Sequence, residues 1–185
     1  MPTAYCTGTY VAFHANGVTE PTESDIKYYN LLKAWRVRDD NDFVFTDSHE
    51  KSGTIRDLSQ RDTVRRHLTT RLLRSKNMVL IIGQTTKEDT DWVPFEITYA
   101  IDRCSIPIIA AYPGYGYITA PAELSGLWPS ALASRIRSGV AHVIHVPFRK
   151  EPLADAVGRF GPNNYPVGAG LTYYGIETYQ SWGYL

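Results

Sequence analysis

The segment DWVPFEI, residues 91–97, contains the residue types in this sequence that are best suited to chemistry. Trp92 and Glu96 are four positions apart, a spacing that places two side chains on one face of a helix. An indole can stack on a flat ligand while a neighbouring carboxylate accepts hydrogen bonds from the hydroxyls of an attached sugar. The pair therefore predicts a site for a ligand that joins a planar ring to a sugar.

Glu96 also has a purely structural interpretation. Proline favours the first helical position, and if Pro94 takes it, Glu96 takes the third, where a glutamate often completes a capping box. The residue in the cap position is then Val93, whose side chain has no acceptor, so only half of the box exists. Both interpretations use the same helix start, and both remain open at this point.

Apolar runs alternate with helical patterns along the chain. The expected strands are 9–13, 43–47, 78–83, 107–112 and 142–148. The expected helices are 24–38, 62–76, 94–104, 129–138 and 151–160. This alternation predicts an α/β fold, in which a parallel sheet has right-handed crossovers and helices on both faces. Five strands favour the flavodoxin-like order 2-1-3-4-5.

A sheet of this order binds ligands beyond the carboxyl ends of its strands, at the switch point between the first and third strands. Polar residues leave the first, second and third predicted strands at this edge, and the helix that begins near Trp92 follows the third strand. We therefore expect these segments to line one cleft. The predicted site residues are Phe13, His14, Asp47, Ser48, Trp92 and Glu96.

Motifs of several other classes are missing from the sequence. His142 and His145 are three apart on a strand, so they point to opposite faces and do not form a two-histidine metal site. His14 stands alone, and a lone histidine is more often a structural hydrogen-bonding group. No zinc-type Cys/His spacing, GxGxxG, GxxxxGK[ST] or GxSxG occurs. We therefore expect no metal, no dinucleotide cofactor site and no P-loop.

The composition is that of an ordinary globular domain. The 185 residues include 19 basic and 19 acidic side chains, so the formal net charge is zero and no general attraction to nucleic acid or to a membrane surface is expected. No apolar run is long enough to span a bilayer, and MPTAYCTGTYVAF lacks the pattern of a signal peptide. With two cysteines, the chain is expected to be cytoplasmic with free thiols.

Two regions are expected from the distribution of these patterns. Residues 1–160 contain all of the predicted strands and helices. Residues 161–185 form an aromatic tail without a clear period, which we expect to pack on the domain or on a partner.

Five blocks, in order over residues 9–112, resemble bacterial TIR-like proteins of the Thoeris antiphage type. The blocks are YVAFHANG, YYNLLKAW, FVFTDSHEKSG, TVRRHLTTRLLRSKNMVLIIGQTT and DWVPFEITYAIDRCSIPIIAAY. The resemblance implies a flavodoxin-like, TIR-like fold and NAD as substrate, with no separate cofactor. It implies that Glu96 is the catalytic glutamate. The pocket-lining positions that it implies are Phe13, His14, Asp47, Ser48 and Trp92.

The same resemblance implies a biological role. The enzyme would cleave the nicotinamide–ribose bond and make a cyclic ADP-ribose-type signal that activates a separate effector in antiphage defence. Self-association and a phage-derived trigger are the further partners that it implies. Two alternatives stay open, namely a non-catalytic TIR interaction or scaffold module, and a nucleoside or nucleotide glycosyl-transfer enzyme of similar architecture.

Overall fold

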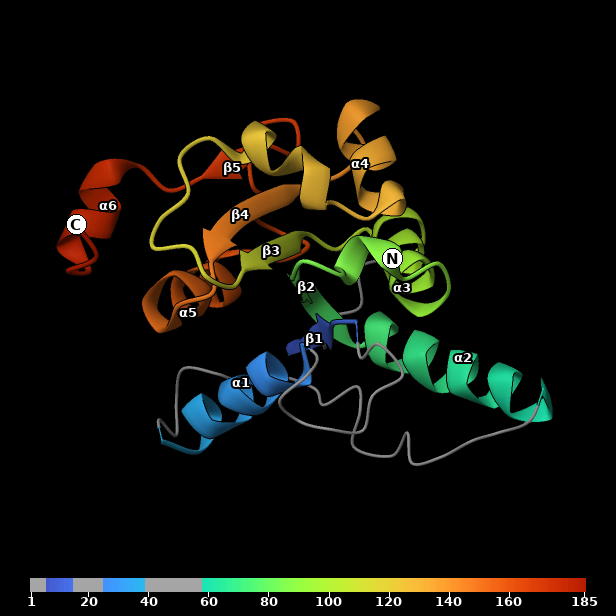
Figure 1. The fold of residues 1–185 in the computed structure, drawn as a ribbon. Helices are drawn as coiled ribbons and strands as arrows, with labels where there is room; N and C mark the ends of the chain where they lie inside the picture. Colours follow the sequence, from blue (N-terminus) through green and yellow to red (C-terminus); the bar gives the residue numbers. More distant parts are fainter. Residues whose placement is uncertain (1–5, 15–24, 39–57) are drawn as a thin grey trace.

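A computed structural model of the chain describes residues 6–14, 25–38 and 58–185, which form one parallel sheet with helices on both faces (Figure 1). The strands are β1 (Gly8–Ala12), β2 (Ser75–Ile81), β3 (Ile108–Tyr112), β4 (Val143–Pro147) and β5 (Thr172–Tyr173). The helices are α1 (Ile26–Arg38), α2 (Leu58–Leu73), α3 (Trp92–Asp102), α4 (Ser130–Arg137), α5 (Lys150–Arg159) and α6 (Ile176–Ser181), with 3-10 turns η1 (Thr86–Glu88) and η2 (Pro121–Leu127).

The predicted α/β fold with a parallel sheet is confirmed. The expected strands near 9–13, 78–83, 107–112 and 142–148 correspond to β1, β2, β3 and β4. Each of these strands pairs with the next, as the predicted order 2-1-3-4-5 requires for its first, third, fourth and fifth strands. The expected strand at 43–47 lies outside the described residues. Among the described strands the order is β1-β2-β3-β4-β5, and the fifth is the tail segment Thr172–Tyr173 rather than the predicted second strand. Two residues are too few to show a strand period, so the sequence pattern did not predict β5.

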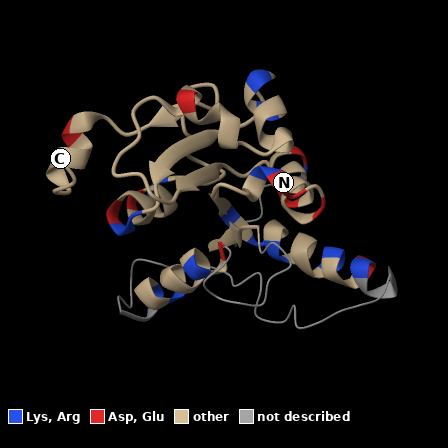
Figure 2. Cartoon of the chain, viewed as in Figure 1, with Lys and Arg blue, Asp and Glu red and all other residues tan. Residues whose placement is uncertain are grey.

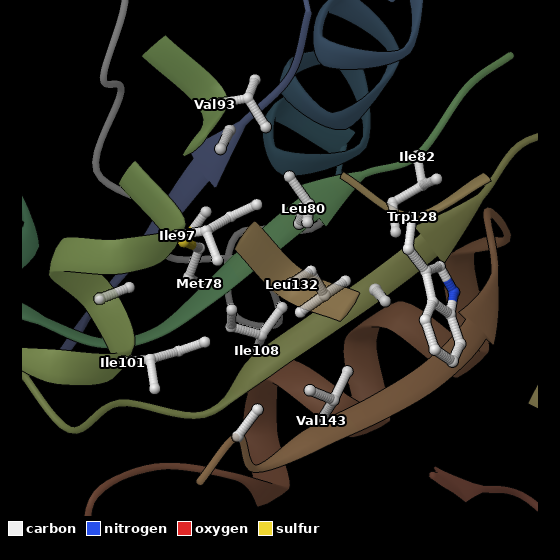
Figure 3. Close-up of a cluster of buried hydrophobic side chains, with 14 of the residues drawn as sticks. Met78, Leu80, Ile82, Val93, Ile97, Ile101, Ile108, Trp128, Leu132 and Val143 are labelled. Atoms are coloured by element: carbon white, nitrogen blue, oxygen red, sulfur yellow. The ribbon is translucent and has the colours of Figure 1, made fainter. Parts of the chain in front are cut away.

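Alternation along the strands divides the core into two clusters. Tyr10 and Ala12 of β1 face the first cluster, which α2, α3 and α4 cover and which Figure 3 shows in close-up. Val11 and Phe13 face the second cluster, on the other side of the sheet, which α1, α5 and the tail cover. The side of the sheet on which a residue lies therefore decides which helices it can contact.

Strand β2 begins earlier than predicted, at Ser75, although its first residues are polar. The Asn77 side chain is fully buried, and its amide donates hydrogen bonds to the carbonyl oxygens of Val157 and Phe160, at 3.0 and 2.8 Å. Its oxygen accepts a bond from the Thr9 hydroxyl at 2.7 Å. Because these partners replace water, a polar side chain is accommodated within a buried strand.

A buried polar chain connects β3, β4 and the tail. The His145 Nε2 atom lies 2.9 Å from the carbonyl oxygen of Gly170, so Nε2 carries the proton and Nδ1 accepts a bond from the Tyr112 hydroxyl at 2.7 Å. The Trp128 indole N–H donates in turn to the Tyr112 oxygen at 2.8 Å. Burial lowers the pKa of His145 to about 4, so the ring is neutral at physiological pH.

The aromatic tail packs on the second cluster. Tyr179 is fully buried and donates its hydroxyl to the carbonyl oxygen of Ile118 at 3.2 Å, and Tyr174 is 6% exposed and contacts the ring of Tyr179 edge-on. The Tyr174 hydroxyl also donates to Asp155 of α5 at 2.5 Å. Within the residues described, every helix is too short or too polar to cross a bilayer.

The burial of Tyr179 generates a test of the tail. Tyr179→Ala removes a fully buried ring and should lower the free energy of unfolding by about 3–5 kcal/mol, as loss of a large core side chain does. Tyr173→Ala, which removes a ring that is 47% exposed, should cost no more than about 0.5 kcal/mol. Urea unfolding followed by circular dichroism measures both values. Equal and small losses would show that the tail does not stabilise the domain.

Candidate functional site

The helix that carries Glu96 begins two residues earlier than predicted. Helix α3 starts at Trp92, because the Asp89 carboxylate accepts hydrogen bonds from the backbone N–H groups of Asp91 and Trp92 at 2.8 and 3.0 Å. Pro94 is therefore the third helical residue and Glu96 the fifth. The capping-box interpretation of Glu96 is wrong, since Glu96 lies beyond the third helical position and its carboxyl group bonds to Tyr10.

The Glu96 side chain is directed into the protein. It is 3% exposed, and its Oε1 atom accepts a hydrogen bond of 2.5 Å from the hydroxyl of Tyr10, a fully buried residue of β1. Burial raises the pKa of Glu96 to about 8; the bond from Tyr10 acts against this rise, and the nearby Asp89 carboxylate adds to it. At neutral pH, most molecules of the protein without ligand therefore hold Glu96 in its protonated form.

Trp92 lies one helical turn before Glu96, as its spacing predicts. The indole is half-buried and packs against the first cluster. The Arg61 guanidinium of α2, a helix with many basic positions (Figure 2), lies 5.8 Å from the centre of the Trp92 ring and also pairs with Asp91. The ring therefore has a cationic neighbour on the outer surface of the domain.

The structure does not bring all of the predicted residues together. Phe13 is buried in the second cluster, where it stacks on Tyr29 at 5.1 Å, on the opposite side of the sheet from Tyr10 and Glu96. Asp47 and Ser48 lie outside the described residues. A surface hollow on α3, lined by residues such as Phe95 and Thr98, does not include Glu96.

His14 lies at the predicted switch point. Its Nδ1–H donates a hydrogen bond of 3.0 Å to the carbonyl oxygen of Thr85 and thereby connects the carboxyl ends of β1 and β2. In the neutral tautomer that donates through Nδ1, the Nε2 atom is the acceptor. The position agrees with the sheet edge at which the sequence places a ligand, and the role of His14 toward a ligand stays a prediction.

The sequence interpretation missed a buried carboxylate at the same edge. Asp25, before α1, is 8% exposed and accepts a hydrogen bond of 3.0 Å from the hydroxyl of Thr86, which itself accepts the backbone N–H of Gly83 at 2.8 Å. Burial raises the pKa of Asp25, and the bond from Thr86 and the charge of His14 act in the opposite direction. A Cβ atom on Gly83 would lie 2.3 Å from Asp25 Oδ1, so only glycine allows this approach. The sequence offers two signals for this contact: Asp25 stands at the start of the expected helix 24–38, and GQTT, residues 83–86, follows the apolar run of the expected strand 78–83.

These features define a class of protein: an α/β domain with a buried glutamate on the helix that follows the second described strand of a parallel sheet. Among the residues that the structure describes, no group of three or more His, Cys, Asp or Glu side chains is arranged to hold a metal ion. The family described as "Thoeris protein ThsB, TIR-like domain" matches residues 10–116, which is more than half of the chain. The chain belongs to this family and is a TIR-type module of antiphage defence.

The match begins at Tyr10 and includes His14, Trp92 and Glu96. Helices α4, α5 and α6, strands β4 and β5 and the tyrosines of the tail lie outside the matched range. The candidate site is therefore contained in the part of the chain that is similar to the family.

The burial of Glu96 makes stability depend on pH in a defined direction. The folded protein keeps a proton on Glu96 that the unfolded chain loses near pH 4.5, so this group stabilises the fold fully at low pH and the effect is lost as pH rises toward 8. The slope is at most about 1.4 kcal/mol per pH unit within this range. Glu96→Gln cannot ionise, so its melting temperature should rise relative to that of the wild type as pH increases from 5 to 9.

Differential scanning calorimetry of both proteins across this range measures the difference. Glu123→Gln, at an exposed position of η2, is the matched control and should keep a constant difference from the wild type. A Glu96→Gln difference that does not change with pH would show that Glu96 is ionised in the folded protein at every pH tested.

Proposed function

We propose that the chain is a TIR-like enzyme that cleaves the nicotinamide–ribose bond of NAD, with Glu96 as its catalytic residue. The observation that carries the proposal is the Glu96 carboxyl group, which is 3% exposed, has a pKa raised to about 8 and lies within the range that matches the family. A well-packed core does not favour an ionisable group unless another requirement selects it, and strongly shifted carboxyl groups are concentrated in active sites.

The proposed reaction suits a single carboxylate. The C–N bond between ribose and nicotinamide breaks with both electrons going to the ring nitrogen, so the cationic ring leaves as neutral nicotinamide and requires no proton donor. The ribosyl group then has oxocarbenium character, as in glycoside hydrolysis. A carboxylate beside the ribose stabilises this positive charge and accepts hydrogen bonds from the sugar hydroxyls.

The charge of the substrate is matched to the state of Glu96. Burial favours the protonated acid in the protein without ligand, and the positive nicotinamide–ribose unit favours the carboxylate when it approaches. The proton of Glu96 then passes to solvent as the substrate binds. Glu96 therefore carries its negative charge when the positive nicotinamide–ribose unit is beside it.

Trp92 and His14 are the proposed binding residues among those that the structure describes. The Trp92 indole offers a flat face one turn from Glu96, and the His14 Nε2 atom offers an acceptor at the ends of β1 and β2. Phe13, Asp47 and Ser48 belong to the same proposal on the family resemblance alone.

The product depends on which nucleophile captures the ribosyl cation. Water adds its oxygen to the sugar carbon and loses a proton to give ADP-ribose, whereas a hydroxyl or ring nitrogen of the same molecule gives a cyclic product. We propose the cyclic product as the diffusible signal to a separate effector in the cytoplasm. Self-association of the chain and a phage-derived trigger are the proposed means of activation.

A second candidate function is a non-catalytic interaction module. It is favoured by the near-complete burial of Glu96 and by the contact of Arg61 with Trp92, because both side chains already have partners within the domain. In such a module the pair of Tyr10 and Glu96 would serve only as a core contact.

The two functions differ in one assay. Purified protein is incubated with NAD at several protein concentrations, because activity that needs association rises with concentration, and the products are resolved by chromatography and mass spectrometry. Glu96→Gln keeps the side-chain shape and removes the charge, so it should lower nicotinamide release by at least about 100-fold. Glu123→Gln should keep the wild-type rate. Release at the wild-type rate by Glu96→Gln, or none from the wild type at any concentration, would support the interaction module.

A further inference from the structure

We propose that Tyr10 is the positioning residue of Glu96: its hydroxyl fixes the Oε1 atom and supports the charged form of the carboxyl group within an apolar environment. The inference rests on the proposed function and assigns a role to a residue of β1 that makes no proposed contact with substrate. Three observations carry it, namely the rigid placement of Tyr10, the geometry of its hydrogen bond and the arrangement of charges around Glu96.

Tyr10 is held on the sheet rather than on a loop. Its Cα position is paired with Met78 of β2 in the parallel register, and its side chain is fully buried in the first cluster. A ring packed in this way loses little further freedom when its hydroxyl makes a hydrogen bond. The hydroxyl is therefore a fixed point from which a side chain on α3 can be oriented.

The hydrogen bond joins residues that are 86 positions apart in the chain, and its length is 2.5 Å. A hydroxyl that donates to a carboxyl oxygen stabilises the ionised form more than the neutral form. Because Oε1 accepts this bond, the proposal assigns the contact with a ligand to the other carboxyl oxygen, Oε2. Tyr10 thus selects which oxygen is presented.

The other charged groups around α3 do not replace this interaction. Asp89 precedes the helix and disfavours a second negative charge at Glu96. Three basic side chains on the neighbouring helices have other partners: Arg61 pairs with Asp91, Arg65 lies over the Phe95 ring and Arg135 pairs with Asp102. Tyr10 is accordingly the residue whose contact lowers the pKa of Glu96 against burial and Asp89.

Tyr10→Phe preserves the ring and removes the donor. The pKa of Glu96 should rise by about one to two units, which corresponds to the loss of a hydrogen bond to a charged group. At pH 7 kcat/KM for NAD cleavage should fall by about tenfold or more, mainly through a higher KM, because Glu96 must lose its proton when the substrate binds, and most of the loss should be recovered at pH 9. A residue that merely supports the fold would lower the rate by the same factor at every pH.

The direct experiment is an NMR titration of the 13C-labelled glutamate carboxyl carbons in the full-length protein without NAD, with Glu96→Gln used to assign the Glu96 signal. Tyr179→Phe is the matched control, because Tyr179 is also fully buried, belongs to the second cluster and donates its hydroxyl to the carbonyl oxygen of Ile118 rather than to Glu96. It should leave the Glu96 titration unchanged. An unshifted Glu96 titration in folded Tyr10→Phe would overturn the inference.

A second substitution covers the case in which Tyr10→Phe does not fold. Site-specific replacement of Tyr10 by 3-fluorotyrosine keeps the hydroxyl and makes it a stronger donor, so the pKa of Glu96 should fall rather than rise. No shift, or a shift in the other direction, contradicts the proposed role of Tyr10.

The outcomes separate this inference from the proposed function. If the titration shifts as expected but the wild type releases no nicotinamide, Tyr10 controls the ionisation of Glu96 and the proposed enzyme activity is wrong. If the wild type cleaves NAD through Glu96 and folded Tyr10→Phe has the same rate and pH profile, the activity stands and the positioning role is wrong.

Discussion

A carboxyl group in an apolar core is the constraint on which the rest of this structure depends. Glu96 is only 3% exposed, so the neutral acid is favoured, and within the described part of the chain the Tyr10 hydroxyl donates a hydrogen bond that favours the charge. The Asp89 carboxylate accepts hydrogen bonds from the N–H groups of Asp91 and Trp92 at the start of α3, and Glu96 lies one turn further along this helix. The hydrogen bond from Tyr10 of β1 to Glu96 of α3, together with the bonds to Asp89 at the start of α3, fixes the position of the Oε1 atom.

The surrounding architecture keeps these two elements in position. Apolar side chains from β1, β2 and α3 share the first cluster, and the Arg135 guanidinium of α4 binds the Asp102 carboxylate at the far end of α3 at 2.9 Å. Toward the opposite edge of the described sheet, His145 of β4 donates a hydrogen bond to the carbonyl oxygen of Gly170 and so fixes the loop before β5. The tail therefore packs as part of the domain core. The candidate site lies at the other edge of the described sheet, where β1 pairs with β2.

Much of this arrangement follows from the sequence, and the exceptions have physical reasons. Long apolar runs predicted β1 to β4, and the spacing of Trp92 and Glu96 predicted their shared helix. The start of α3 was misplaced because a side chain before the helix, that of Asp89, sets it. The bond from Tyr10 to Glu96 crosses most of the matched region, and no local pattern indicates such a contact. Phe13 is three residues from Tyr10, a spacing that places the two side chains on opposite faces of a strand, and its assignment to the site stays a prediction.

The central claim is that the ribose of NAD meets the Glu96 carboxylate. The most direct measurement is the 13C signal of Glu96 at pH 7 during titration with carba-NAD, an analogue that keeps the cationic nicotinamide and resists cleavage. The account predicts that the signal moves from the position of the protonated acid to that of the carboxylate as the ligand saturates the protein. A Glu96 signal that stays at the protonated position at saturating ligand would contradict it.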